Sequence, residues 1–176
     1  QNPGPTINSA QGDAQASISA DGLTFYFQSD RPGGYGNVDL YMAIRATRND
    51  SWGPAVNLGP TINTSADDCD AWISADDLEL YFMSTRSGGY GAADIWMTRR
   101  ATKNDTWSVP VNLGPVVNSA YNEALPCLSP DGRLLFFQDY GKPRPGGYGG
   151  GDFWMTRRAI LSDPWPTPVN LGPKIN

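Results

Sequence analysis

Residues 18–63 read ISADGLTFYFQSDRPGGYGNVDLYMAIRATRNDSWGPAVNLGPTIN, and the chain repeats this pattern twice more. The second copy, residues 73–118, reads ISADDLELYFMSTRSGGYGAADIWMTRRATKNDTWSVPVNLGPVVN. The third, residues 128–176, reads LSPDGRLLFFQDYGKPRPGGYGGGDFWMTRRAILSDPWPTPVNLGPKIN, with three extra residues before its GGYG. Asp21, Asp76 and Asp131 lie 55 residues apart. This period indicates modules that pack against their neighbours. We place the repeats at about 8–62, 63–117 and 118–176 of a single domain, 1–176.

Each repeat predicts four short strands. Strand one is expected at 15–19, 70–74 and 125–129, followed by a turn in SADG, SADD or SPDG. Strand two (LTFYFQS, LELYFMS, LLFFQD) is apolar on both faces, which is typical of a strand packed on both sides. Strand three begins at DLYMAIR, DIWMTRR and DFWMTRR, and strand four carries a proline that favours a sheet edge. No helical periodicity is present, so the fold class is all-β with three four-stranded antiparallel blades of a β-propeller.

Composition excludes several functions. The 176 residues contain no histidine, so a Ser-His-Asp triad, a Cys-His pair and a histidine-ligated zinc cannot form within the chain. The net charge of −5 and the absence of basic runs argue against nucleic acid as a partner. No apolar run is long enough to span a membrane, and no signal peptide is visible. Cys69 and Cys127 lie in neighbouring first strands, where a disulfide or two free buried thiols are both open.

The motifs SPDG, LFF or LYF, GGYG, W..PVNLG and IN resemble the TolB-type, WD-like β-propeller repeat of bacterial envelope and secreted proteins. The resemblance covers essentially the whole chain and implies a periplasmic or secreted location. It also implies a ring of six or seven blades, whereas this chain has three. Because strand two is apolar on both faces in every copy, we expect a homodimer that completes a six-bladed ring, with segments 2–8 and 170–176 meeting between chains. The alternative is a part of a longer propeller.

Candidate site residues lie at the start of strand one, which lines the central axis of a propeller. An acidic residue occupies the same position in all three copies, and variable residues follow it. A ring of these acids could bind Ca²⁺, or each acid could accept N–H groups of its own loop. Tyrosines of the GGYG loops are expected to cover the neighbouring blade, or else to form an aromatic rim. The acids are Asp13, Asp68 and Glu123; the variable candidates are Asp70 and Trp72; the loop residues are Tyr35, Tyr90 and Tyr148.

Three further sets are expected to be structural. Strand three opens with an aspartate that either accepts loop N–H groups or pairs with the loop arginine. A tryptophan at the start of strand four is expected to pack between blades, and asparagines are expected to tie strand ends to turns. These sets are Asp39, Asp94 and Asp152 with Arg31, Arg86 and Arg144; Trp52, Trp107 and Trp165; and Asn57, Asn112 and Asn170.

The leading functional hypothesis is a non-catalytic binding or scaffolding module whose ligand, a protein segment or a glycan, binds at the channel mouth. The second is a carbohydrate-active enzyme using carboxylates such as Asp13, Asp68, Asp70 and Glu123, because paired carboxylates can hydrolyse glycosides without histidine. The third is a purely structural repeat module. No catalytic residue is assigned, and Ca²⁺ is the only cofactor considered.

Overall fold

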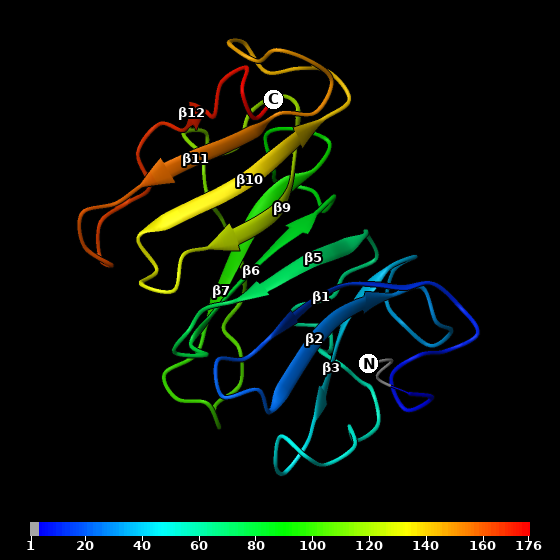
Figure 1. Ribbon diagram of the computed structural model, residues 1–176. Helices are drawn as coiled ribbons and strands as arrows, with labels where there is room; N and C mark the ends of the chain where they lie inside the picture. The colour runs from blue at the N-terminus through cyan, green and yellow to red at the C-terminus, as the bar shows by residue number, and fades with distance from the viewer. Residues whose placement is uncertain (1–3) are drawn as a thin grey trace.

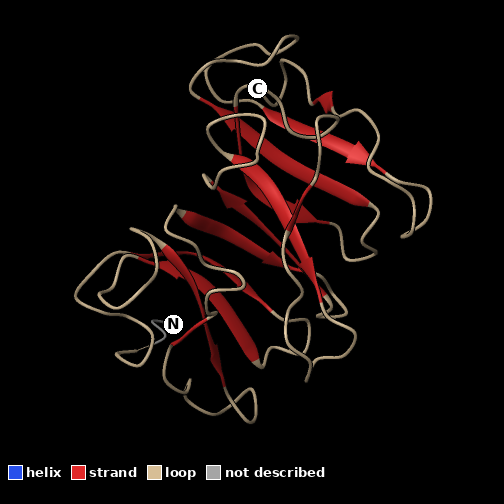
Figure 2. Cartoon of the chain, turned by 180° about the vertical axis from the view of Figure 1, so that it is seen from behind, coloured by secondary structure: helices blue, strands red, loops and turns tan. Residues whose placement is uncertain are grey.

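The computed structural model describes residues 4–176, and all their regular structure is strand (Figures 1 and 2). Twelve strands form three four-stranded antiparallel sheets, each with its strands in sequence order. This confirms the predicted all-β fold with three propeller blades. The strands are β1 (Asp13–Ile18), β2 (Thr24–Ser29), β3 (Asp39–Ile44) and β4 (Val56–Asn57); β5 (Asp68–Ile73), β6 (Glu79–Ser84), β7 (Asp94–Arg99) and β8 (Val111–Asn112); β9 (Asn122–Leu128), β10 (Leu134–Tyr140), β11 (Phe153–Arg157) and β12 (Val169–Asn170).

The blades stand side by side in a row, with the first and third at opposite ends (Figure 1). The inner strands β1, β5 and β9 contact one another in that order, and among residues 4–176 the strands of blades one and three make no contact. Two apolar cores fill the junctions between successive blades. The first contains Tyr26, Leu80 and Phe82, and the second contains Tyr81 and Phe137. Alternate side chains of the middle strand therefore pack on opposite neighbours, as its two apolar faces predicted.

Two of the three tryptophans that precede strand four lie at the edges of these cores. Trp107 packs against the first core and Trp165 against the second, as predicted for residues between blades. Trp52 packs instead in a cluster on the face of blade one that no preceding blade covers, so the prediction is wrong for this residue. An arginine covers each indole ring: the guanidinium carbon lies 4.3 Å from the ring centroid in the pairs Arg100–Trp107 and Arg158–Trp165. Each Trp thus combines apolar burial with a cation–π contact.

Strand four is much shorter than predicted. The sequence indicated a strand of about eight residues, but β4, β8 and β12 contain two residues each. Pro54, Pro110 and Pro168 lie just before these pairs and have no N–H to donate to a ladder. The predicted edge position is confirmed, since all three strands end their sheets.

Asparagine side chains join each blade to the segment that leads into the next. Asn63 accepts a hydrogen bond from the backbone N–H of Leu40 and donates one to its carbonyl, both at 2.9 Å. Asn118 makes the same pair of bonds with Ile95, and Asn176 makes it with Phe153. The side-chain amide therefore acts as one more backbone unit beside strand three.

Among residues 4–176, no blade lies against the outer face of blade three. Leu40 and Ile95 are fully buried in the junctions, but Phe153, at the same position of the third repeat, is 43% exposed. Ile62 and Val117 are likewise fully buried, whereas Ile175 is 63% exposed. The apolar face that blades one and two bury therefore remains open on blade three.

Candidate functional site

The acidic residues of strand one are bound inside their own blades. The Arg31 guanidinium lies 2.6 Å from the Asp13 carboxylate, and Arg86 lies 2.5 Å from Asp68. The third pair, Arg144–Glu123, is longer at 3.7 Å. Each carboxylate also accepts a backbone N–H and a hydroxyl from the preceding turn, from Ser9, Thr64 and Ser119 respectively. The loop arginine of each blade is thus paired with the acid of strand one and not with the aspartate of strand three.

The expected grouping of the three acids is not found. Within residues 4–176, no three or more Cys, Asp or Glu side chains lie close enough together to hold a metal ion. The reason is local: each carboxylate turns to its own arginine and turn. Binding of Ca²⁺ to Asp13, Asp68 and Glu123 stays a prediction.

The same arginines are stacked on aromatic rings. Arg86 lies 5.1 Å from the ring centroids of both Phe82 and Trp96, and its Nη2 also donates to the Ile62 carbonyl. Arg31 and Arg144 are held in the same way by Phe27 and Tyr41, and by Phe137 and Trp154. These arginines therefore carry both an ion pair and aromatic packing, which makes them structural.

The pKa values of two of these acids, Asp13 and Glu123, are shifted in opposite directions. Burial alone would raise the pKa of Asp13, but hydrogen bonds from Ser9, Ser29 and Arg31 lower it to about 2. Burial raises the pKa of Glu123, and the bonds from Ser119 and the charge of Arg144 offset this only in part. The longer ion pair of Glu123 fits this difference.

The GGYG loops are closed by the aspartate of strand three. In blade one, the Asp39 carboxylate accepts the backbone N–H groups of Tyr35 and Gly36 and the amide of Asn57. A Cβ at Gly34 would lie 1.8 Å from that carboxylate, so only glycine fits there. Asp94 and Asp152 accept the equivalent tyrosine N–H bonds. The prediction that these aspartates bind their loops is confirmed.

The loop tyrosines are about half exposed: Tyr35, Tyr90 and Tyr148 are 49%, 50% and 61% exposed. The expectation that they cover the neighbouring blade, with an aromatic rim as the alternative, stays a prediction. The last glycine of the motif contacts the segment that leads to the next blade, since a Cβ at Gly36 would lie 2.0 Å from the Ala66 carbonyl oxygen.

The inner strands form a cleft at the axial end of the blades. Each has a bulge, with positive φ at Gln15, Asp70 and Leu125. The Asp70 N–H donates to Gln28, and the Asp70 carboxylate accepts the Leu125 N–H, so this residue links three blades. A cleft of about 210 Å³ lies here, lined by Gln15, Ala16, Asp70, Ala71, Trp72, Leu125, Pro126 and Cys127.

Two predicted ligand residues, Asp70 and Trp72, are therefore together in the cleft, as the variable positions suggested. Burial raises the pKa of Asp70, partly offset by the bond from Leu125. Cys69 and Cys127 are both free thiols, so the structure has no disulfide between these two neighbouring strands.

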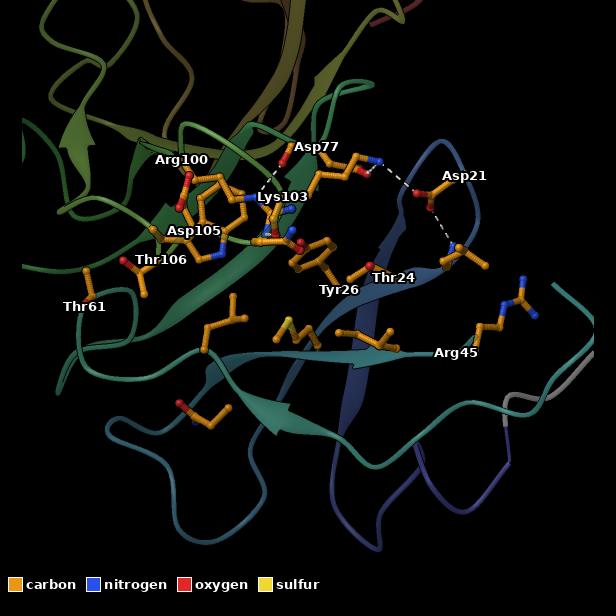
Figure 3. A pocket seen from close by; sticks show the side chains of 17 residues that line it. Asp21, Thr24, Tyr26, Arg45, Thr61, Asp77, Arg100, Lys103, Asp105 and Thr106 are labelled. Atoms are coloured by element: carbon orange, nitrogen blue, oxygen red, sulfur yellow. Dashed lines mark hydrogen bonds and ion pairs between the residues drawn. The ribbon is translucent and has the colours of Figure 1, made fainter. Parts of the chain in front are cut away.

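A larger pocket, of about 550 Å³, opens between blades one and two (Figure 3). Tyr26, Arg100 and Lys103 line it, and Lys103 bridges Asp77 at 2.5 Å and Asp21 at 2.9 Å. Sequence reasoning missed this pocket. The available signal was a difference between copies: the residue two before the strand-two tyrosine is threonine in the first repeat and glutamate in the second.

Comparison with solved structures supports one fold. A protein assigned as TolB from Agrobacterium tumefaciens matches with a TM-score of 0.62 and 18% identity, over 94% of this chain and 51% of that one. TolB from Acinetobacter baumannii matches with a TM-score of 0.57 and 18% identity, over 90% of this chain and 32% of that one. The fold is that of a TolB-type β-propeller.

A thermostable family-43 glycoside hydrolase is also similar, with a TM-score of 0.54 and 13% identity over 98% of this chain and 62% of the hydrolase. The chain thus spans about half of the first TolB structure and about a third of the second. No family model and no curated protein sequence matches it. Within residues 4–176 there is no helix with the length and apolar character needed to cross a membrane.

Proposed function

We propose that this propeller is a non-catalytic binding module of the bacterial envelope or exterior, and that it binds a glycan or a protein segment at the axial cleft. The observation that carries the proposal is the placement of Asp70 and Trp72 in that cleft. Positions shared by all three copies are used in ion pairs and turns, whereas the residues that differ between copies meet here. A partly buried indole beside a carboxylate offers both a flat apolar surface and a polar anchor.

The test is a glycan array together with a peptide library, followed by titration of each hit against variants. Trp72→Ala and Asp70→Asn should weaken binding at least tenfold. Val109→Ala, at a site that is 77% exposed and outside the cleft, serves as the matched control and should bind normally. Binding that survives both cleft substitutions but is lost when Tyr35, Tyr90 and Tyr148 are replaced would move the site to the loop rim.

An enzyme is the second candidate. Similarity in fold to a glycoside hydrolase favours it, since two carboxylates flanking a glycosidic bond suffice for that reaction. Among the residues that line the axial cleft, however, Asp70 is the only carboxylate. Hydrolysis of any array hit by the native chain, lost in Asp70→Asn, would overturn the non-catalytic assignment.

We also propose that the open flank of blade three is covered in the working assembly, with a second copy giving a six-bladed ring. The exposed Phe153 and Ile175 support this, since the equivalent residues of blades one and two are fully buried. Residues 2 and 3 of the predicted contact segment lie outside the described residues. Light scattering at micromolar concentration should give twice the 19.0 kDa chain mass. A stable monomer would contradict the dimer and leave the longer-propeller alternative.

A further inference from the structure

The two blade junctions differ in the polar groups around the strand-two tyrosine. In the junction of blades two and three, the Tyr81 hydroxyl donates to the Glu79 carboxylate at 2.9 Å. Arg158, from blade three, lies 3.5 Å from the same carboxylate oxygen, and Arg99 of blade two lies 2.9 Å from the other oxygen. Tyrosine and arginine thus bind an internal carboxylate from opposite sides of the junction, and that carboxylate lies at the edge of a smaller pocket of about 370 Å³.

The junction of blades one and two keeps the tyrosine and the arginine of the following blade but lacks this carboxylate, and Ile44 stands where blade two has Arg99. Tyr26 occupies the position of Tyr81 on strand two, and Arg100 occupies the position of Arg158. Arg100 makes the same structural contacts: it donates through Nε to the Asp77 carbonyl, and its guanidinium covers Trp107. Thr24 stands where blade two has Glu79, so its short side chain leaves the space open.

Within residues 4–176 the Tyr26 hydroxyl makes no hydrogen bond of normal geometry, although the residue is only 1% exposed, lines the pocket and lies near Arg100. A buried hydroxyl without a partner is destabilising, so a ligand that accepts this bond gains affinity. Arg100 donates through Nε and Nη1 to backbone carbonyls, and a guanidinium has five N–H donors, so others remain for a ligand.

Asp77 adds a second, opposite requirement. Its Oδ2 binds Lys103, but within residues 4–176 its buried Oδ1 has no hydrogen-bond partner. A ligand that fills this pocket would therefore offer a donor, such as a hydroxyl, beside its carboxylate. The remaining acids are already engaged: Asp21 with Lys103, and Asp105 with the backbone and hydroxyl of Thr102.

We propose that the pocket between blades one and two is a binding site for a hydroxylated carboxylate, the chemistry of a sugar acid. Tyr26 and Arg100 bind the carboxylate in place of the glutamate that blade two supplies to its own junction. Asp77 accepts a hydrogen bond from a neighbouring hydroxyl. This site is separate from the axial cleft and does not depend on it.

The test uses calorimetric titration with glucuronate as the probe. Glucose lacks the carboxylate, acetate lacks the hydroxyls, and N-acetylglutamate presents a carboxylate of amino-acid type. The native chain should bind one glucuronate, and should bind glucose and acetate at least tenfold more weakly. If N-acetylglutamate binds more tightly than glucuronate, the sugar-acid assignment is overturned in favour of an acidic peptide group.

Exchanging the residues at positions 24 and 79 gives the sharpest control. Thr24→Glu should supply the missing carboxylate internally, abolish glucuronate binding and raise the melting temperature. Glu79→Thr should open space in the second junction, but Gly132 stands there in the place of Asp77, so the stoichiometry should stay at one. Tyr26→Phe removes only the hydroxyl, so it should remain folded and bind at least tenfold more weakly. Equal glucuronate affinity in the native chain, Thr24→Glu and Tyr26→Phe, or no binding to the native chain, would overturn the proposal.

Discussion

The second and third blades have the same strands but different surroundings. Blade two is covered on both faces, and its central residues Tyr81 and Phe82 are fully buried. In blade three only one face is covered: Phe137 is 1% exposed, while Phe153 on the open face is 43% exposed. The sequence of a blade decides its sheet, but its neighbours decide how much of that sheet is buried. Stability in this molecule is therefore shared between blades.

The largest expected loss comes from the tryptophan that fills a closed junction. Trp107→Ala removes an indole packed between blades one and two, which should cost about 3–5 kcal/mol of unfolding free energy. Trp52 has the same arginine contact at 4.3 Å but lies on the face of blade one without a preceding blade. Trp52→Ala should therefore cost less. Urea midpoints measure both, and equal losses would break the distinction between closed and open faces.

A second pair tests the open flank directly. Ile95→Ala in the closed junction should cost at least about 2 kcal/mol. Phe153→Ala, at the equivalent position of blade three, should cost less than about 1 kcal/mol in dilute protein. Unfolding is followed at several protein concentrations. A cost for Phe153→Ala that grows with concentration would show that another chain covers the flank.

The two junctions can be compared by removing one hydroxyl from each. Tyr81→Phe breaks the bond to Glu79 and should cost about 1–2 kcal/mol. Tyr26→Phe removes a hydroxyl that has no partner and should leave stability unchanged or slightly raised. Thermal unfolding without ligand measures both. Equal losses would mean that the Tyr26 hydroxyl is satisfied in solution.

The smallest effects are expected from pH. The pKa of Asp13 is lowered from 3.8 to about 2, so its contribution is complete above pH 3.8 and is lost as pH falls through 2. The cost of Asp13→Asn should therefore fade across that window. The pKa of Glu123 is raised above 4.5, so the native chain gains stability as pH falls toward 4.5, and Glu123→Gln should cost more at acid than at neutral pH. Unfolding midpoints in urea from pH 2 to 7 are the measurement; parallel profiles would contradict it.

Much of the fold could be predicted because the same pattern of strands and turns occurs in three copies of the sequence. Apolar residues on both faces of strand two predicted blades in contact, and proline predicted that strand four is an edge. The length of strand four could not be read correctly, because residues around Pro54 look extended yet form only two ladder pairs. The bulges were also invisible, since Gln15 and Leu125, at two of the three positions with positive φ, are not residues that favour it.

Less of the candidate site could be predicted. Equivalent acids suggested a ring about the axis, but Arg31 and Asp13 are 18 residues apart and are joined only when β1 and β2 pair. The pocket between blades one and two depends on residues from both, so no local motif marks it. The sequence did contain a difference between copies, Thr24 in the first and Glu79 in the second. This difference can be interpreted only once the structure shows that each residue lies near the buried tyrosine of its strand, Tyr26 or Tyr81.

The asparagine bonds beside strand three have a consequence for engineering. Because Asn63 is bonded to Leu40 and Asn118 to Ile95, the module that can be moved as a unit is not the sequence repeat but the sheet plus its bonded asparagine. Asn176 already makes this bond with Phe153. Concatenating further 55-residue copies after Asn176 would therefore present each added blade with a preformed edge, and Asn118→Ala would loosen the joint between existing blades without removing an apolar contact.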